Sequence, residues 1–150
     1  MNFGINKGCF VMIEYLFRIA AFVEQKVGID VDIEVANLFA YDDTDEVIYI
    51  TDEKDELDVA WDVFILEYLK DEFYLDIKGK GEYICEMYSL LHEIGHSKTM
   101  HLFDFDEYER EADKLPDEDF LAYRKLYGEY LADDWAVSFI NKYPEVLNIK

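Results

Sequence analysis

The chain has 150 residues, of which 35 are Asp or Glu and only 14 are Lys or Arg, so its formal net charge at pH 7 is −21. This balance argues against binding to nucleic acid or to an anionic membrane through phosphate groups, because such contacts need Lys and Arg. Apolar residues make up 51% of the chain and only seven residues are Gly, which excludes a disordered or fibrous protein. The length suits a single domain that spans residues 1–150.

The two cysteines, Cys9 and Cys85, are too few for a disulfide framework and indicate a reducing compartment. We expect Cys85 to be a small core residue. The apolar stretch 9–23 carries Glu14 and Arg18 at helical spacing, and no segment reaches the roughly 18 uninterrupted apolar residues of a membrane-spanning helix. We therefore expect a cytoplasmic protein with no membrane partner. The sequence does not indicate an oligomeric state.

The first third of the chain predicts one helix and two strands. Residues 9–26 have a helical pattern that ends at Gly28. Residues 29–35 alternate apolar and acidic side chains, which is typical of a half-exposed strand. The acidic residues 42–46 predict a turn, and residues 47–50 predict the second strand.

The middle of the chain predicts two further helices. Acidic residues between positions 52 and 55 can cap a helix that runs to about Phe73. Residues 75–77 predict a short edge strand, and the glycines at positions 79 and 81 separate it from the next helix. That helix is expected within residues 82–101, which no proline interrupts.

The last third of the chain predicts an irregular segment and then one long helix. Residues 97–117 are acidic and irregular, with a helical turn expected around 106–114. The long helix is expected over residues 116–143, with Pro144 as its stop. The fold class that follows is α+β: a small, mainly helical domain with a short sheet of two or three strands.

The sequence His-Glu-Ile-Gly-His at positions 92–96 lies within the helix expected over 82–101. Residues four apart share one helix face, so the imidazoles of His92 and His96 can reach the same metal ion. Glu93 lies about 100° around the helix and can reach a water molecule on that ion. Two of the three histidines in the chain have this spacing. The pattern therefore predicts a metal-binding helix that carries its own catalytic base, and the competing interpretation is a half-buried helix with ordinary polar histidines.

A catalytic zinc site usually has three protein ligands, so two histidines leave one ligand to be found. His101 lies five residues beyond the second histidine and well round the helix from it, although it could contact substrate. Residues 109–113 offer further carboxylates on a segment that a proline soon ends. Glu129 and Asp133 are four residues apart in the long final helix and share one face. Glu129 is the candidate that we favour, with Asp133 hydrogen-bonded to the free ring nitrogen of a histidine.

The His-Glu-x-x-His pattern at 92–96, followed by Glu-x-x-Ala-Asp at 129–133, resembles that of a gluzincin-type metallopeptidase. Among small families of this type, the chain is most similar to the ImmA/IrrE-type peptidases of phages and mobile elements. The metallopeptidase domain of ArdC-type antirestriction proteins is a close second. The resemblance covers roughly residues 82–140 and implies a zincin-like domain with an active-site helix. It also implies one Zn²⁺ per chain and hydrolysis of an intracellular protein or peptide.

The roles that this resemblance implies can be assigned by residue number. The metal ligands would be His92, His96 and Glu129, with Asp133 behind a histidine. Glu93 would be the general base that accepts a proton from the water activated by the metal.

The sequence leaves two features of this proposed enzyme open. The oxyanion of peptide hydrolysis needs a donor besides the metal, and His101, Tyr127, Tyr130 and Tyr88 are all candidates. The acidic segment within residues 97–117 could cover the cleft and regulate activity. No residue pattern decides either question.

A second function is compatible with the net charge of −21. The chain could be an acidic binding or decoy protein that mimics nucleic acid and occupies a basic partner, with a structural or vestigial metal site. A decoy, however, has no need of Glu93 between two correctly spaced histidines. We therefore prefer the peptidase hypothesis.

Overall fold

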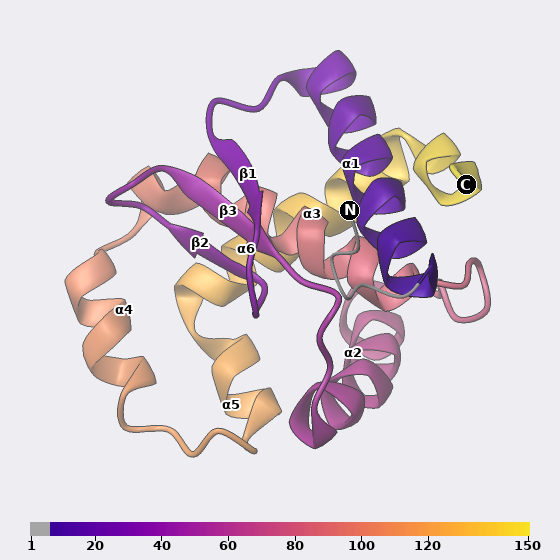
Figure 1. The fold of residues 1–150 in the computed structure, drawn as a ribbon. Helices are drawn as coiled ribbons and strands as arrows, with labels where there is room; N and C mark the ends of the chain where they lie inside the picture. The colour runs from indigo at the N-terminus through magenta and orange to yellow at the C-terminus, as the bar shows by residue number, and fades with distance from the viewer. Residues whose placement is uncertain (1–6) are drawn as a thin grey trace.

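The computed structural model of the chain describes residues 7–150, with side chains from residue 11 onward. It confirms an α+β architecture in which helices dominate and a single small sheet is present among the described residues (Figure 1). In chain order the elements are α1 (Lys7–Val27), β1 (Asp32–Val35), β2 (Ala40–Asp42), β3 (Val47–Ile50), α2 (Glu56–Phe73), α3 (Ile84–Thr99), η1 (Met100–Leu102), α4 (Phe105–Ala112), α5 (Phe120–Lys125), α6 (Tyr127–Lys142) and η2 (Pro144–Asn148).

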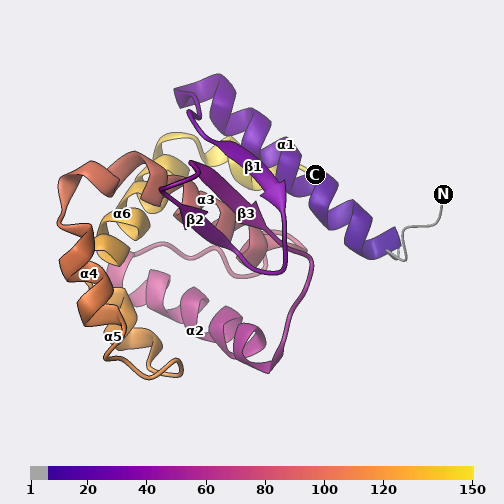
Figure 2. The same ribbon diagram turned by 60° about the vertical axis from the view of Figure 1, so that its left-hand side comes forward.

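The sheet has three strands in the order β1-β3-β2, with β1 parallel and β2 antiparallel to the central β3. Ile48 of β3 is fully buried and pairs with Ile33 on one side and Tyr41 on the other. The predicted first strand is confirmed but is shorter than 29–35. The strand β2 was not predicted, because its three residues are all half-buried and have no alternation. Figure 2 shows the sheet in front of α3, which contacts both β2 and β3.

The helix α3 forms the centre of the molecule. Its Met87, Leu90, Leu91 and Ile94 are fully buried, and the helix packs most extensively against α6. Helix α2 begins at a capping box made by Asp55 and ends at Phe73, as predicted. The core therefore surrounds α3 and fixes the helix that carries the histidine pattern.

Two predictions for the remaining elements are wrong. Residues 75–77 do not form a strand; their alternation arises because Leu75 and Ile77 are buried in a loop while Asp76 is exposed. The helix predicted over 116–143 is divided into α5 and α6, because Leu126 has an extended backbone with φ −61° and ψ 137°. The expected helical turn around 106–114 is the eight-residue helix α4.

Cys85 is buried in the core cluster, which confirms its expected role. The side chain of Cys9 falls outside the described residues. Within the described part of the chain, every helix is too short or too polar to span a lipid bilayer.

Candidate metal centre

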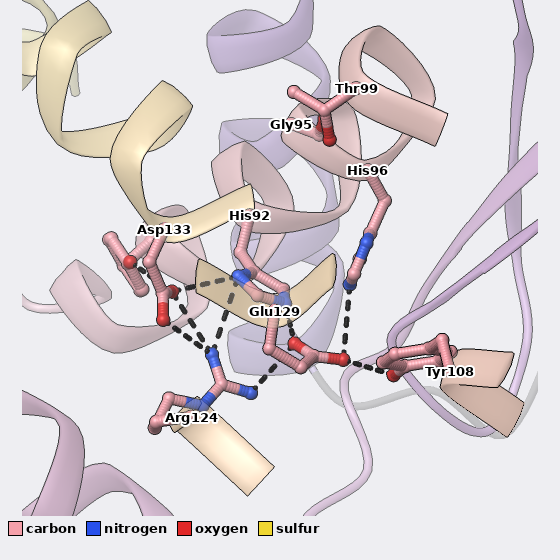
Figure 3. A network of polar contacts seen from close by, with 9 residues as sticks. His92, Gly95, His96, Thr99, Tyr108, Arg124, Glu129 and Asp133 are labelled. Carbon is pink, nitrogen blue, oxygen red and sulfur yellow. Dashed lines mark hydrogen bonds and ion pairs between the residues drawn. The ribbon is translucent and has the colours of Figure 1, made fainter. Parts of the chain in front are cut away.

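His92 and His96 lie one turn apart on α3, and Glu129 of α6 lies opposite them (Figure 3). All three side chains are buried, and one potential ligand atom from each lies within 4.8 Å of the other two. The Nε2 atom of His92 is 2.7 Å from Oε2 of Glu129, and Nε2 of His96 is 3.3 Å from Oε1. Two imidazoles and a carboxylate are a donor set that suits a divalent transition metal. The structure thus brings together the three predicted ligands as a group that could bind a metal ion.

Asp133 lies one turn after Glu129 on α6 and has no solvent-exposed surface. Its Oδ1 atom is 2.9 Å from Nδ1 of His92 and accepts a hydrogen bond of 2.5 Å from the Tyr88 hydroxyl. An imidazole that donates from Nδ1 to a carboxylate keeps Nε2 available as a metal ligand. Asp133 therefore occupies the position predicted for it, and it orients His92 in particular.

The distance between the two ligand-bearing helices is set by small residues. A Cβ atom built on Gly95 of α3 would lie only 2.7 Å from the carbonyl oxygen of Ala132 on α6, and 3.1 Å from its Cα. Gly95 lies between the two histidines of α3, and Ala132 lies between Glu129 and Asp133. The absence of a side chain at Gly95 therefore lets the backbone of α3 approach the ligand-bearing turn of α6.

Arg124 is a component of the site that the sequence did not predict. Its Nη1 donates to both carboxylate oxygens of Asp133 at 3.0 and 3.1 Å, and its Nη2 donates to Oε2 of Glu129 at 3.0 Å. The guanidinium is buried and lies over the ring of Trp61, 4.5 Å from the centroid. Figure 3 shows it beneath the two carboxylates, on a different helix from either. The break at Leu126 places α5 so that Arg124 can reach back to α6.

The buried charges keep both carboxylates ionised. Burial by itself would raise the pKa of Glu129, but His96, His92 and Arg124 lower it well below its usual range. The pKa of Asp133 is lowered in the same way by His92 and Arg124, again against the effect of burial. For His92, burial would lower the pKa, but Glu129 and Asp133 raise it to about 10. In the metal-free protein His92 is therefore protonated at neutral pH, and a metal ion would have to displace that proton.

A cavity of about 380 Å³ opens beside this group. His92, Glu93, Arg124 and Glu129 line one part of it, and Glu93 is half-buried there. Apolar side chains from the 37–39 loop, α2 and α5 complete the wall, among them Leu38, Leu57, Trp61 and Phe120. The predicted base and two of the three predicted ligands thus face one space.

Of the other sequence candidates, Tyr88 reaches the site, but its buried hydroxyl donates to Asp133 and does not line the cavity. The remaining candidates do not reach the metal group. His101 is exposed on η1, and residues 109–111 are exposed on α4. Tyr127 and Tyr130 are 58% and 45% exposed, and Tyr130 stacks on Phe73.

A second tyrosine at the site was not among the candidates. The hydroxyl of Tyr108, from α4, donates to Oε1 of Glu129 at 2.5 Å. With twelve tyrosines in the chain, no spacing rule could have selected this one. One residue of the acidic segment therefore contacts the metal group, whereas no residue of 97–117 lines the cavity.

No family model, curated protein or solved structure matches this chain. The residues of the site itself therefore carry the functional proposal that follows.

Proposed function

We propose that this chain is a zinc-dependent peptidase of gluzincin type, with a zincin-like domain similar to those of the ImmA/IrrE-type enzymes. One observation carries the proposal: His92, His96 and Glu129 form a buried group of metal-ligand type, and two of its members share a cavity with Glu93. In a chain of net charge −21, exposed carboxylates are expected everywhere, but a buried carboxylate between two imidazoles is not.

The donor set fits a zinc ion on chemical grounds. Zinc favours histidine nitrogen and carboxylate oxygen, and a catalytic site leaves one position open. Here His92 and His96 would each contribute Nε2 and Glu129 a carboxylate oxygen, and the cavity borders the same group. When bound, the metal would act as a Lewis acid that polarises a peptide carbonyl and acidifies a water molecule.

The residues around that position have separate tasks. Glu93 accepts the proton of the attacking water and passes it to the leaving amine, because its side chain faces the cavity and follows His92 directly on α3. Asp133 holds the His92 ring by its Nδ1 atom. The hydroxyl of Tyr108 donates its one hydrogen to Oε1 of Glu129 and so holds that ligand in place.

The substrate that this site suits is a protein or peptide. The cavity of about 380 Å³ combines carboxylates with apolar side chains, as a pocket for peptide side chains would. A cytoplasmic location and an intracellular protein substrate belong to the same proposal.

The test compares the wild-type chain with Glu93→Gln, each loaded with Zn²⁺ and freed of excess metal. We expect one zinc per chain in both proteins. Cleavage of a mixed peptide library should fall by about 10²–10⁴-fold in the variant, since the general base is lost while the ligands remain. Glu67→Gln, at an exposed position of α2, is the matched control and should cleave like the wild type.

Two outcomes would overturn the proposal. Equal cleavage by Glu93→Gln would remove Glu93 from the mechanism. A wild-type chain that binds no zinc would leave the peptidase without its metal and would favour the acidic decoy, which predicts tight, salt-sensitive binding to a basic partner.

A further inference from the structure

Arg124 makes more polar contacts within the metal group than a simple ion pair requires. Its two terminal nitrogens donate to two different carboxylates, those of Glu129 and Asp133. The residue is only 7% exposed, so these contacts are made away from water. Among the described residues no partner is found for its buried Nε atom. The guanidinium is thus oriented by its two ends, toward the two carboxylates.

We propose that Arg124 is the positioning residue of this metal centre: its guanidinium fixes Glu129 and Asp133 so that Glu129 and His92 are already placed to bind a metal ion. The inference rests on the proposed function, because it assumes that His92, His96 and Glu129 are metal ligands.

The two oxygens of Glu129 show how this positioning would work. Oε2 accepts a hydrogen bond from Arg124 at 3.0 Å, and Oε1 accepts one from Tyr108 at 2.5 Å. Each oxygen is therefore held by a residue other than the two histidines. A glutamate side chain without such contacts can rotate about three bonds, and that freedom must be lost when it binds a metal. A planar guanidinium that bridges two carboxylates restricts both of them at once.

The position of Arg124 is itself fixed by its surroundings. It lies on α5, whose first turn is capped by Asp119, and its guanidinium lies against Trp61 of α2. Phe120 packs edge-on against the same Trp61 ring, 5.8 Å between centroids. The guanidinium is thus held on one face by an aromatic ring and at its two ends by carboxylates. Such a fixed group can orient the side chains that would bind the metal.

Two effects of opposite sign make the proposal testable. Removal of a positive charge beside a cation site would by itself tighten metal binding, because repulsion is lost. Loss of positioning would weaken metal binding, by about 10- to 100-fold for outer-shell partners of ligands. A weakened affinity is therefore opposite in sign to the effect of the lost repulsion, and it supports positioning when the Co²⁺ spectrum also changes.

The experiment measures the affinity of the full chain for Zn²⁺ by competition with a chelator, and the visible absorption spectrum of the Co²⁺-loaded protein. The variants are Arg124→Gln and Arg124→Lys, and Lys125→Gln is the matched control, since it removes a neighbouring exposed charge of α5. We expect about 10- to 100-fold weaker zinc binding and an altered Co²⁺ spectrum for Arg124→Gln. Arg124→Lys should be intermediate, because an ammonium cannot bridge both carboxylates. The control should match the wild type.

Chemical rescue of zinc affinity tests whether the guanidinium group itself acts on the site. Added guanidinium at low millimolar concentration should restore part of the zinc affinity of Arg124→Gln, whereas added ammonium should not. If Arg124→Gln does not fold, Arg124→Lys decides the question, since it retains the buried charge.

The inference would be overturned if a folded Arg124→Gln bound zinc as tightly as the wild type or more tightly. It would equally be overturned if Arg124→Lys kept both the wild-type affinity and the wild-type Co²⁺ spectrum. A wild-type chain that binds no metal would refute the proposed function first, and this inference with it. Wild-type metal binding with unchanged variants would refute the inference alone.

Discussion

Replacement of Gly95 by alanine would place a methyl group between the two helices that carry the candidate ligands. The new Cβ would lie 2.7 Å from the backbone oxygen of Ala132, whereas ordinary contacts begin at 3.4 Å. The helices α3 and α6 would have to separate locally by about 0.7 Å, the difference between these two distances, because a backbone atom cannot rotate away. This displacement would move Glu129 relative to His92 and His96.

Gly95→Ala is expected to affect the free energy of unfolding and the zinc affinity to different extents. Overpacking of a core contact costs about 1–3 kcal/mol, and the better helix propensity of alanine offsets about 1 kcal/mol of it. The net loss of up to about 2 kcal/mol corresponds to a fall in Tm of up to about 8 °C for a chain of this size. Metal–ligand distances, however, tolerate only about 0.2 Å. We therefore expect a larger proportional loss in zinc affinity than in the free energy of unfolding of the metal-free protein.

The assay combines thermal unfolding in chelator, followed by circular dichroism, with zinc affinity from chelator competition. Gly81→Ala is the matched control, because its new Cβ would meet nothing within 4 Å and its backbone is not left-handed. We expect the control to retain both properties. If Gly95→Ala kept the wild-type Tm and the wild-type zinc affinity, the close approach of α3 and α6 could not be what sets the ligand spacing.

Three further predictions concern single side chains. The pKa of His92 is raised from 6.5 to about 10. Protonated His92 therefore stabilises the metal-free protein fully below about pH 6.5, and this stabilisation is lost as the pH rises toward 10. The free energy of unfolding, measured with urea in the presence of chelator, should fall by at most about 5 kcal/mol over this pH range. The variant His92→Gln should not show this fall, and equal pH profiles for the two proteins would contradict the prediction. Burial raises the pKa of Cys85 to about 12. In a Cys9→Ser variant, iodoacetamide at pH 8 should therefore react with Cys85 only after unfolding. Labelling of the native protein at the rate of a free thiol would contradict this. Tyr108→Phe should destabilise the metal-free protein to urea by about 1–3 kcal/mol, while exposed Tyr127→Phe should not, and equal stabilities would count against the hydrogen bond to Glu129.

Helical periodicity accounts for the part of the site that could be predicted from the sequence. His92 and His96 are four residues apart, and so are Glu129 and Asp133, and each pair shares one face of its helix. These faces meet because α3 and α6 pack against each other. The prediction needed only that both segments be helical, and neither contains a proline.

Arg124 could not be predicted by the same rule. In one continuous helix, five residues of separation would place it about 140° round from Glu129, on a different face. The extended backbone at Leu126 changes that direction, and no proline marks the break. Tyr108 was missed for a related reason, because α4 reaches the site through a tertiary contact that no local pattern records. The wrong strand at 75–77 shows the converse error, in which alternation arose from loop burial alone.

Glu129 also connects the candidate metal centre to the segment between α3 and α6. Tyr108 of α4 holds one of its oxygens and Arg124 of α5 holds the other, so both helices of this segment are attached to the same carboxylate. Thermodynamic linkage makes such a connection reciprocal. If metal binding strengthens these contacts, the metal stabilises the docked segment, and a protein that pulls α4 or α5 away must lower metal affinity by the same free energy. A partner that binds the segment between α3 and α6 could then change the metal affinity of the site without entering the cavity.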